Sequence, residues 1–143
     1  VRTLDEGRRV IEALAKNVAR KREIAQQYAS LFAAEGIGLF LEQPWARSNY
    51  WLNTVFLGDA ERRDRVLRHI RSKGIGARPL FAAVHSQDMY SACPHGKLET
   101  AVGMIRESLS LPSSPSQTNE QIAFVAESVI AGLNEGAMSG RGA

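Results

Sequence analysis

The sequence predicts an α+β domain in which a small, mainly antiparallel sheet of about three strands is packed with helices, one of them long and N-terminal. Three observations point to this class. Apolar residues recur every three or four positions in long segments near both ends of the chain, which is typical of amphipathic helices. Short runs of aromatic and β-branched residues lie between those segments and favour strands. The strands are too few for a doubly wound parallel sheet.

The first predicted element is a long helix from Val10 to about Glu35. Its apolar positions step by three and four, and Gly36 follows, where a left-handed backbone can end a helix. Residues 1–9 are charged and show no periodicity, so we expect a loose lead-in there. The packed domain is expected to span residues 10–135. A flexible tail is expected over 136–143, which is rich in Gly, Ser and Ala.

The best strand candidate is the run from Tyr50 to Leu57, whose residue types favour a pleated and buried surface. We expect this strand to be the spine of the sheet. Asp59 then provides a helix N-cap, and a basic helix follows that ends at Gly74. A short strand ending at Phe81 completes this central unit.

The remaining elements are shorter. Residues 39–41 are apolar enough for a short extended piece, and residues 82–97 form a long loop without periodicity. A loop of that length in a small domain is usually functional or mobile. A short helix is predicted over 98–105 and a third strand over 109–111. A final helix follows Thr118, whose spacing to Gln121 matches a capping box.

Composition limits the classes of function. The net charge is +3 and the pI is near 9.4, and six basic residues crowd the helix between residues 59 and 74. We interpret them as the solvated side of that helix, since no nucleic-acid-binding motif accompanies them. No apolar run approaches the roughly 20 residues of a membrane helix. The single Cys93 fits a reducing compartment, so we expect a soluble, cytoplasmic protein.

The long loop contains His85, Asp88, Cys93 and His95, which are residue types that bind metals or perform catalysis. A zinc site needs four well-spaced ligands, and no second pair of ligands occurs elsewhere, so we predict no metal site. Cys93 and His95 are too close in sequence for the histidine to be oriented as a base for the thiol. We therefore assign no catalytic and no cofactor-binding residue to this chain.

Arg78 stands next to a proline, at the end of a short strand and at the start of the long loop. This position suits a guanidinium that binds a carboxylate or a phosphate group. A structural ion pair is an equally good interpretation of the same pattern.

Several motifs together resemble one enzyme family. They are, in order, Ser48–Asn53, Gly74–Ile75, Arg78–Phe81, Met89–Pro94 and Leu109–Ser114. Their order and spacing resemble the C-terminal small domain of the nucleotide-sugar aminotransferases of the DegT/DnrJ/StrS group, which are fold-type-I, pyridoxal-phosphate enzymes. Residues 19–28 resemble the helix that joins the two domains of these enzymes. The motifs are most similar to those of the branch that makes 4-amino sugars of the bacillosamine and legionaminic-acid type.

The resemblance implies amino transfer from an amino acid such as glutamate to a keto-deoxy nucleotide sugar, with pyridoxal 5'-phosphate as the electron sink. The family's cofactor lysine belongs to a large N-terminal domain, so we expect the chain alone to bind no cofactor and to be inactive. The implied partners are that large domain, the nucleotide sugar and a second copy of the intact enzyme in a homodimer.

The resemblance also identifies Arg78, His85 and Tyr90 as residues that line the substrate. The chain has Phe81-Ala82-Ala83-Val84-His85 where the family has Phe-Pro-Pro-x-His, a departure next to His85. Two alternatives stay open. One is a free-standing structural or interaction module, and the other is an anion or nucleic-acid binder that uses the basic helix.

Overall fold

The computed structural model describes residues 4–138 and confirms the predicted α+β class. The elements in chain order are α1 (Leu4–Ala33), β1 (Gly38–Leu39), β2 (Asn53–Phe56), α2 (Ala60–Ser72), β3 (Arg78–Pro79), the 3-10 turns η1 (Val84–Ser86) and η2 (Asp88–Tyr90), α3 (Glu99–Glu107), β4 (Ser108–Leu111) and α4 (Asn119–Met138). The strands form one four-stranded sheet in the order β1-β2-β4-β3. All neighbouring strands are antiparallel.

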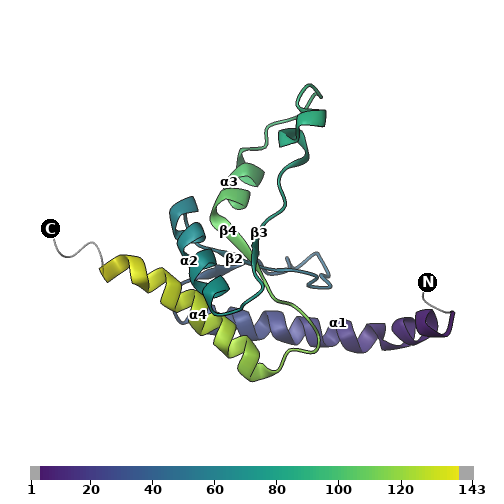
Figure 1. Cartoon of the computed structure of the whole chain (residues 1–143). Helices are drawn as coiled ribbons and strands as arrows, with labels where there is room; N and C mark the ends of the chain where they lie inside the picture. Colours follow the sequence, from purple (N-terminus) through teal and green to yellow (C-terminus); the bar gives the residue numbers. More distant parts are fainter. Residues whose placement is uncertain (1–3, 139–143) are drawn as a thin grey trace.

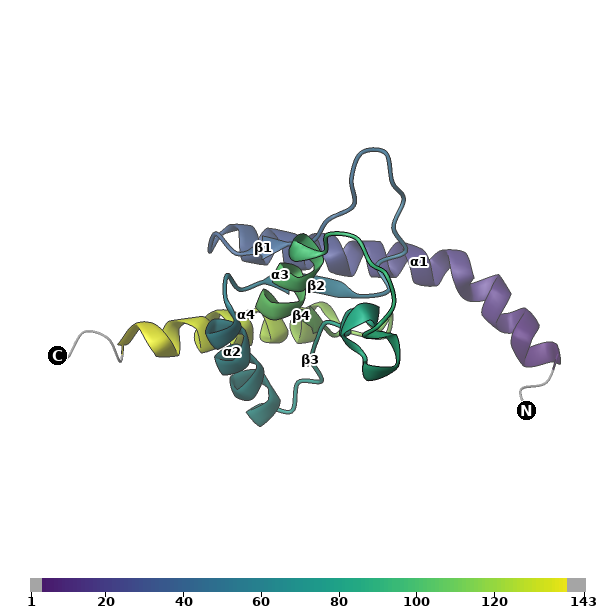
Figure 2. The same cartoon turned by 90° about the horizontal axis from the view of Figure 1, so that it is seen from above.

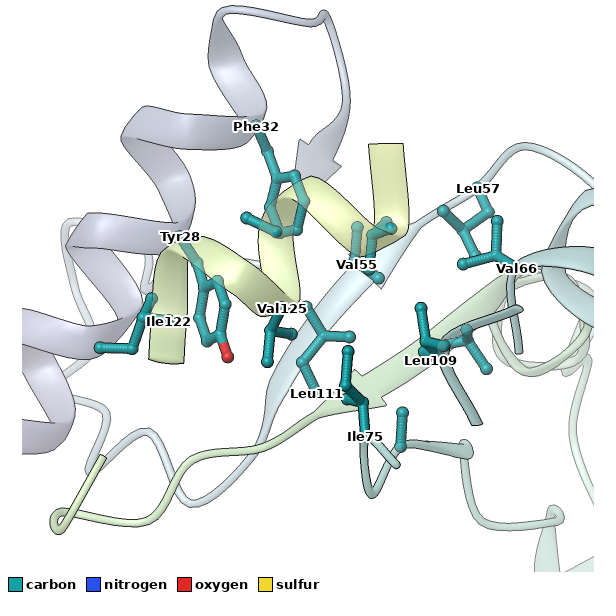
Figure 3. Packing of buried hydrophobic residues seen from close by; sticks show 14 of the residues in the cluster. Tyr28, Phe32, Val55, Leu57, Val66, Ile75, Leu109, Leu111, Ile122 and Val125 are labelled. Carbon is teal, nitrogen blue, oxygen red and sulfur yellow. The ribbon is translucent and has the colours of Figure 1, made fainter. Parts of the chain in front are cut away.

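The sheet and helices form two layers. Val55 of β2 lies opposite Leu109 of β4, so both side chains share one face of the sheet. On that face they join a buried cluster with side chains from α1, α2 and α4 (Figure 3). The N-terminal half of α1 extends well beyond the sheet in both views (Figures 1 and 2). Figure 1 also shows residues 80–98, which we call the arm, projecting away from α1 and α4.

The core is closed by large apolar side chains. Tyr28 and Phe32 of α1 stack with ring centroids 5.9 Å apart, and both are fully buried. Ile122 and Val129 of α4 are also fully buried. Burying a side chain of this size contributes about 1.5–3 kcal/mol, so these contacts hold α1 and α4 against the sheet.

The predicted helix caps at Asp59, Gly74 and Thr118 are confirmed. The Asp59 side chain accepts a hydrogen bond of 2.8 Å from the backbone N–H of Arg62. The Thr118 and Gln121 side chains each accept from the other's backbone N–H, at 3.2 and 3.0 Å, as a capping box does. Gly74 has a φ of +76°, the left-handed conformation in which glycine ends a helix.

Helix α2 has the two-sided character that the sequence predicts. Val66, Leu67 and Ile70 are buried. Its arginines form ion pairs with neighbouring acids, including Arg62 with Asp59 at 3.4 Å and Arg63 with Asp64 at 2.7 Å. The basic cluster is therefore a solvated helix face with interleaved acids, which gives no support to the nucleic-acid alternative.

The helix boundaries differ from the prediction at both ends of the chain. Helix α1 begins at Leu4, so residues 4–9 are helical and are not a loose lead-in. Asp5 and Glu6 lie in its first turn, where acidic side chains favour a helix, and Arg8 pairs with Glu12 at 2.8 Å. Helix α4 runs to Met138, so the predicted tail begins inside a helix. The rest of that tail, 139–143, and residues 1–3 lie outside the described residues.

The sheet also differs in detail. Residues 39–41 were expected to be a short extended piece, and Gly38–Leu39 pairs with β2 as a fourth strand. The predicted strand from Tyr50 to Leu57 is regular over Asn53–Phe56 alone. In the described part of the chain, no helix combines the length and the apolar character that a membrane crossing requires.

Candidate functional site

The three residues predicted to line a substrate lie in two hollows. His85 and Tyr90 line a hollow of about 340 Å³ in the arm, which we call the arm hollow. Arg78 lines a groove of about 340 Å³ along β3 and β4, which we call the Arg78 groove. The residues that line this groove are Leu52, Gly76, Ala77, Arg78, Ser110, Leu111, Pro112 and Ser113. The structure thus brings His85 and Tyr90 together and places Arg78 in a separate groove.

The arm hollow is built by two short 3-10 turns. The Ser86 hydroxyl donates to the carbonyl of Ala83 at 2.7 Å, and the Ser91 hydroxyl donates to the carbonyl of Asp88 at 2.9 Å. These bonds close the turns that carry His85 and Tyr90. The other lining residues are Ala83, Val84, Cys93, Pro94, His95 and Leu98. The hollow therefore offers an apolar surface with two imidazoles and one phenol.

The two histidines of the arm lie close together. Their ring centroids are 4.8 Å apart at an angle of 37°. His95 Nδ1 lies 2.9 Å from the carbonyl oxygen of Gly96, so the tautomer with a proton on Nδ1 can donate to that oxygen. In the part of the chain that the structure describes, no three His, Cys, Asp or Glu residues lie close enough to hold a metal ion. Cys93 is a free, exposed thiol.

Arg78 does not form the structural ion pair that was one of its two interpretations. Among the described residues, no carboxylate lies within ion-pair distance of its guanidinium. The guanidinium carbon lies 4.6 Å from the centre of the Phe81 ring instead. Phe81 in turn stacks on Trp51, with centroids 6.3 Å apart and an angle of 26° between the rings. A cation–π contact of this kind orients a guanidinium without using its N–H groups.

Trp51 was predicted to be part of a buried strand, and this prediction was wrong. Its side chain is 62% exposed, because the chain turns sharply just before it at Tyr50, which has a φ of +45°. A residue other than glycine adopts this conformation where its surroundings fix it. The backbone N–H of Tyr50 donates to Ser48 Oγ at 3.0 Å, and the Tyr50 hydroxyl accepts from the N–H of Glu42 at 3.0 Å.

The turn at Tyr50 is anchored to α1 by an ion pair. Arg22 of α1 pairs with the Glu42 carboxylate and also donates to the carbonyl of Ser48 at 2.7 Å. The Ser48 N–H donates to the same carboxylate at 2.6 Å. The Arg22 hydrogen bond, followed by the bond from Ser48, lowers the pKa of Glu42 to about 2. This anchor fixes residues 42–50 and, through them, the position of Trp51.

The four lysines of this chain lie in different surroundings. Lys16 is exposed on α1, and Lys73 is exposed at the C-cap position that follows α2. Lys21 donates to the carbonyl of Ser113 at 2.6 Å, and burial lowers its pKa. Lys97 shares an open hollow with Glu99, but both residues are exposed, and no arginine, serine or threonine that could hold a phosphate lines that hollow. Lys97 in its hollow therefore lacks the phosphate-binding neighbours that a pyridoxal-phosphate site needs.

Exposed apolar side chains gather on α1, on the arm and on the segment 40–51, where they are Phe40, Leu41, Trp45 and Trp51. On the N-terminal half of α1, which extends beyond the sheet, they are Leu4, Val10, Ile11 and Leu14, with Leu4 95% and Ile11 73% exposed. On the arm they are Phe81, Val84, Met89 and Tyr90, with Met89 76% exposed. Groups of exposed apolar side chains are typical of faces that another protein segment covers.

The fold is similar to that of solved aminotransferases. The aminotransferase TlmJ from Streptoalloteichus hindustanus superposes on 91% of this chain with a TM-score of 0.81 and 26% identity, and this chain covers 35% of it. DesV of S. venezuelae, solved in complex with a ketimine intermediate, superposes on 85% of this chain with a TM-score of 0.72 and 31% identity, over 33% of its own length.

The sequence itself matches the DegT/DnrJ/EryC1/StrS aminotransferase family over residues 7–130, and the chain belongs to this family. GDP-perosamine synthase of Escherichia coli O157:H7 is 32% identical over 112 residues, which are 78% of this chain and 30% of that protein. The corresponding enzyme of Vibrio cholerae is 28% identical over 119 residues. The chain thus spans about a third of the length of the curated relatives it matches. The predicted branch within the family stays a prediction.

Sequence reasoning missed several residues at these sites. Trp51 was assigned to a buried strand and Ser110 to the short third strand, and Glu42 and Arg22 received no role. One local residue indicates the turn before Trp51. The Asn49 side chain accepts a hydrogen bond of 3.0 Å from the backbone N–H of Trp51, and Asn side chains favour such local bonds at turns.

Proposed function

We propose that this chain is the C-terminal part of a pyridoxal-phosphate-dependent nucleotide-sugar aminotransferase. The family match over residues 7–130 carries this proposal. The exposed apolar faces of α1 and the arm support it, because a chain that spans a third of its relatives should expose the surface that the other two thirds cover.

In the proposed reaction, an amino acid such as glutamate gives up its amino group and becomes a 2-oxo acid. The amino group replaces the carbonyl oxygen of a keto-deoxy nucleotide sugar. Pyridoxal phosphate supplies the electron sink when it is bound in the intact enzyme. The residues of this chain would bind and enclose the substrate. Arg78 would hold an anionic group, and His85 and Tyr90 would contact the substrate from the arm.

The arm is suited to an enclosing role. It projects from the sheet, and its apolar surface can exclude water from a reacting group that it covers (Figure 1). The proposed partners are the large cofactor-binding domain of the same enzyme and a second copy in a homodimer. The free thiol of Cys93 fits a reducing compartment, which favours a cytoplasmic location.

The first test uses the chain alone. It is mixed with pyridoxal phosphate, reduced with borohydride, and analysed by intact mass and peptide mapping. We expect no stoichiometric adduct, because no lysine of the chain stands in a site that fits the cofactor. Stoichiometric labelling of one lysine, above all Lys97, would contradict the proposal that the cofactor is bound by the large domain and not by this chain.

The second test asks for the activity. Residues 7–130 of this chain replace the matching third of the E. coli GDP-perosamine synthase. The hybrid is given glutamate and a keto nucleotide sugar as acceptor, and the formation of 2-oxoglutarate is measured. We expect amino transfer. A hybrid that binds pyridoxal phosphate stoichiometrically but transfers no amino group would contradict the proposal. Arg78→Ala in an active hybrid should raise the KM for the sugar or the amino donor and leave cofactor binding unchanged.

A further inference from the structure

We propose that the Arg78 groove binds the oxyanion of a ligand, a carboxylate or phosphate group, between the Arg78 guanidinium and the Ser110 hydroxyl. This inference deepens the proposed function, because it names the group that Arg78 holds and adds Ser110 as a binding residue. The identity of the rest of the ligand depends on the proposed function. The binding of the oxyanion depends on the residues of the groove alone.

The strand register places the two residues side by side. Arg78 of β3 and Ser110 of β4 are directly opposite partners in the antiparallel ladder. Side chains of such partners project from the same face of the sheet, with Cβ atoms about 4.5–5.5 Å apart. Thr54 of β2 lies opposite Ser110 on its other side. This row lies on the sheet face that points away from the core residues Val55 and Leu109, because neighbouring positions along a strand alternate between faces.

Ser110 has an unused hydroxyl. The residue is 3% exposed, and its Oγ has no hydrogen-bond partner among the described residues. A buried hydroxyl without a partner is costly, and this cost falls when a ligand atom accepts its proton. The Oγ atom is itself buried in the structure, so a ligand in the groove meets it once rotation about one bond, χ1, turns the hydroxyl toward the groove. Ser113, in the same groove, is different, because its hydroxyl already donates to the carbonyl of Trp51 at 2.6 Å.

The charge around the groove favours an anion. No Asp or Glu lines it. Besides Arg78, two further cations bond to residues of its wall: Lys21 donates to the carbonyl of Ser113 at 2.6 Å, and Arg71 donates to that of Ala77 at 3.4 Å. An oxyanion in the groove would therefore meet one free guanidinium and the field of two more positive groups.

The groove is also organised before binding. The stacking of Arg78 on Phe81, and of Phe81 on Trp51, restricts the guanidinium and leaves its N–H groups free. Such restriction lowers the entropy lost when a ligand binds. A volume of about 340 Å³ is near the lower end of ligand pockets, which span about 300–1,000 Å³. The groove thus suits one acidic end of a ligand.

The test is a titration of the ¹⁵N-labelled 143-residue chain at constant ionic strength, with inorganic phosphate in one arm and glutarate in the other, and sodium chloride as the reference. We expect saturable shifts of the amide signals of Ala77, Arg78 and Ser110, with Kd in the millimolar range. Tighter binding of phosphate would assign the groove to a phosphate group, and tighter binding of glutarate to a carboxylate. Equal binding would support a general oxyanion site.

Variants link these shifts to the proposed residues. Arg78→Gln should weaken binding roughly tenfold or more, since hydrogen bonds to a charged group are the stronger ones. Ser110→Ala should weaken it by a smaller factor, about threefold. Arg68→Gln on the exposed face of α2 makes the same change of charge away from the groove and should leave binding unchanged.

The proposal fails if neither probe gives saturable shifts, or if Arg78→Gln binds as well as the unmodified chain. This outcome is distinct from failure of the proposed function. Binding to the isolated chain can be found in a protein whose hybrid transfers no amino group, and an active hybrid can be found with an empty Arg78 groove.

Discussion

Gly132 of α4 gives a sharp test of the packing between α2 and α4. In an exposed helix, replacing glycine with alanine stabilises the protein by about 1 kcal/mol. At Gly132 a Cβ atom would lie 3.2 Å from Val66 Cα, 3.2 Å from His69 Cβ and 3.3 Å from His69 Cγ. Val66 Cα is backbone and cannot move alone. His69 is held by a side-chain contact, with its Nδ1 2.6 Å from the Glu135 carboxylate.

The expected size of the effect follows from these contacts. Adding a methyl group to a closely packed interface costs about 1–3 kcal/mol, because backbone must shift. Set against the gain of about 1 kcal/mol in helix propensity, Gly132→Ala should lower the free energy of unfolding by about 0–2 kcal/mol. Gly103 of α3 is the matched control. There a Cβ atom would meet the flexible end of Glu107 at 3.4 Å, so Gly103→Ala should stabilise the protein.

Urea unfolding of the chain and both variants, followed by circular dichroism at 222 nm, measures the difference. We expect Gly103→Ala to be more stable than Gly132→Ala by about 1–3 kcal/mol. If Gly132→Ala is stabilised as much as Gly103→Ala, the close approach of α2 and α4 at this glycine is wrong.

Two further predictions concern the anchors of the fold. Glu42→Gln should destabilise the chain near neutral pH, and the difference from the unmodified chain should shrink as the pH falls from about 4.5 toward 2. The pKa of Glu42 is lowered from 4.5 to about 2 in the folded state. The stabilisation of the fold by the Glu42 carboxylate is therefore complete above about pH 4.5 and is lost as the pH falls toward 2 and the carboxylate is protonated. Urea midpoints measured across this range test it, and a constant difference would contradict it. Thr118→Ala removes half of the capping box and should cost about 0.5–2 kcal/mol, measured in the same assay; a variant as stable as the original would show that the cap is dispensable.

Local chemistry made much of the fold predictable. The Asp59 cap, the capping box at Thr118 and the left-handed Gly74 each depend on residues within three or four positions of one another, and all three are found. The helices that carry an apolar face were also located correctly. One local feature was missed, the start of α1 at Leu4. The other failure depends on distant residues. The run from Tyr50 has strand propensity, but Arg22 and Glu42 impose a turn that no local pattern shows.

The candidate sites were predictable to a lesser degree for the same reason. Arg78 was identified from its place beside a proline, but the sequence left a ligand and an ion pair equally open. Whether Arg78 binds a ligand or forms an ion pair depends on the side chains near its guanidinium. The pairing of β3 with β4 determines those neighbours. Ser110 could not have been found, because a serine in an alternating strand gives no sign that its hydroxyl will lack a partner.

Helix α1 connects the two features on which the proposed function depends. Its C-terminal half holds the segment behind the Arg78 groove: Lys21 bonds to Ser113 at 2.6 Å, and the Tyr28 hydroxyl donates to the carbonyl of Pro112 at 3.2 Å. Its N-terminal half carries the exposed Leu4 and Ile11. Because the 30 residues of α1 form one continuous helix, a protein segment that packs on the exposed half also sets the position of the groove. Under the proposed function, docking of the larger domain and placement of the Arg78 groove are therefore coupled through one continuous helix.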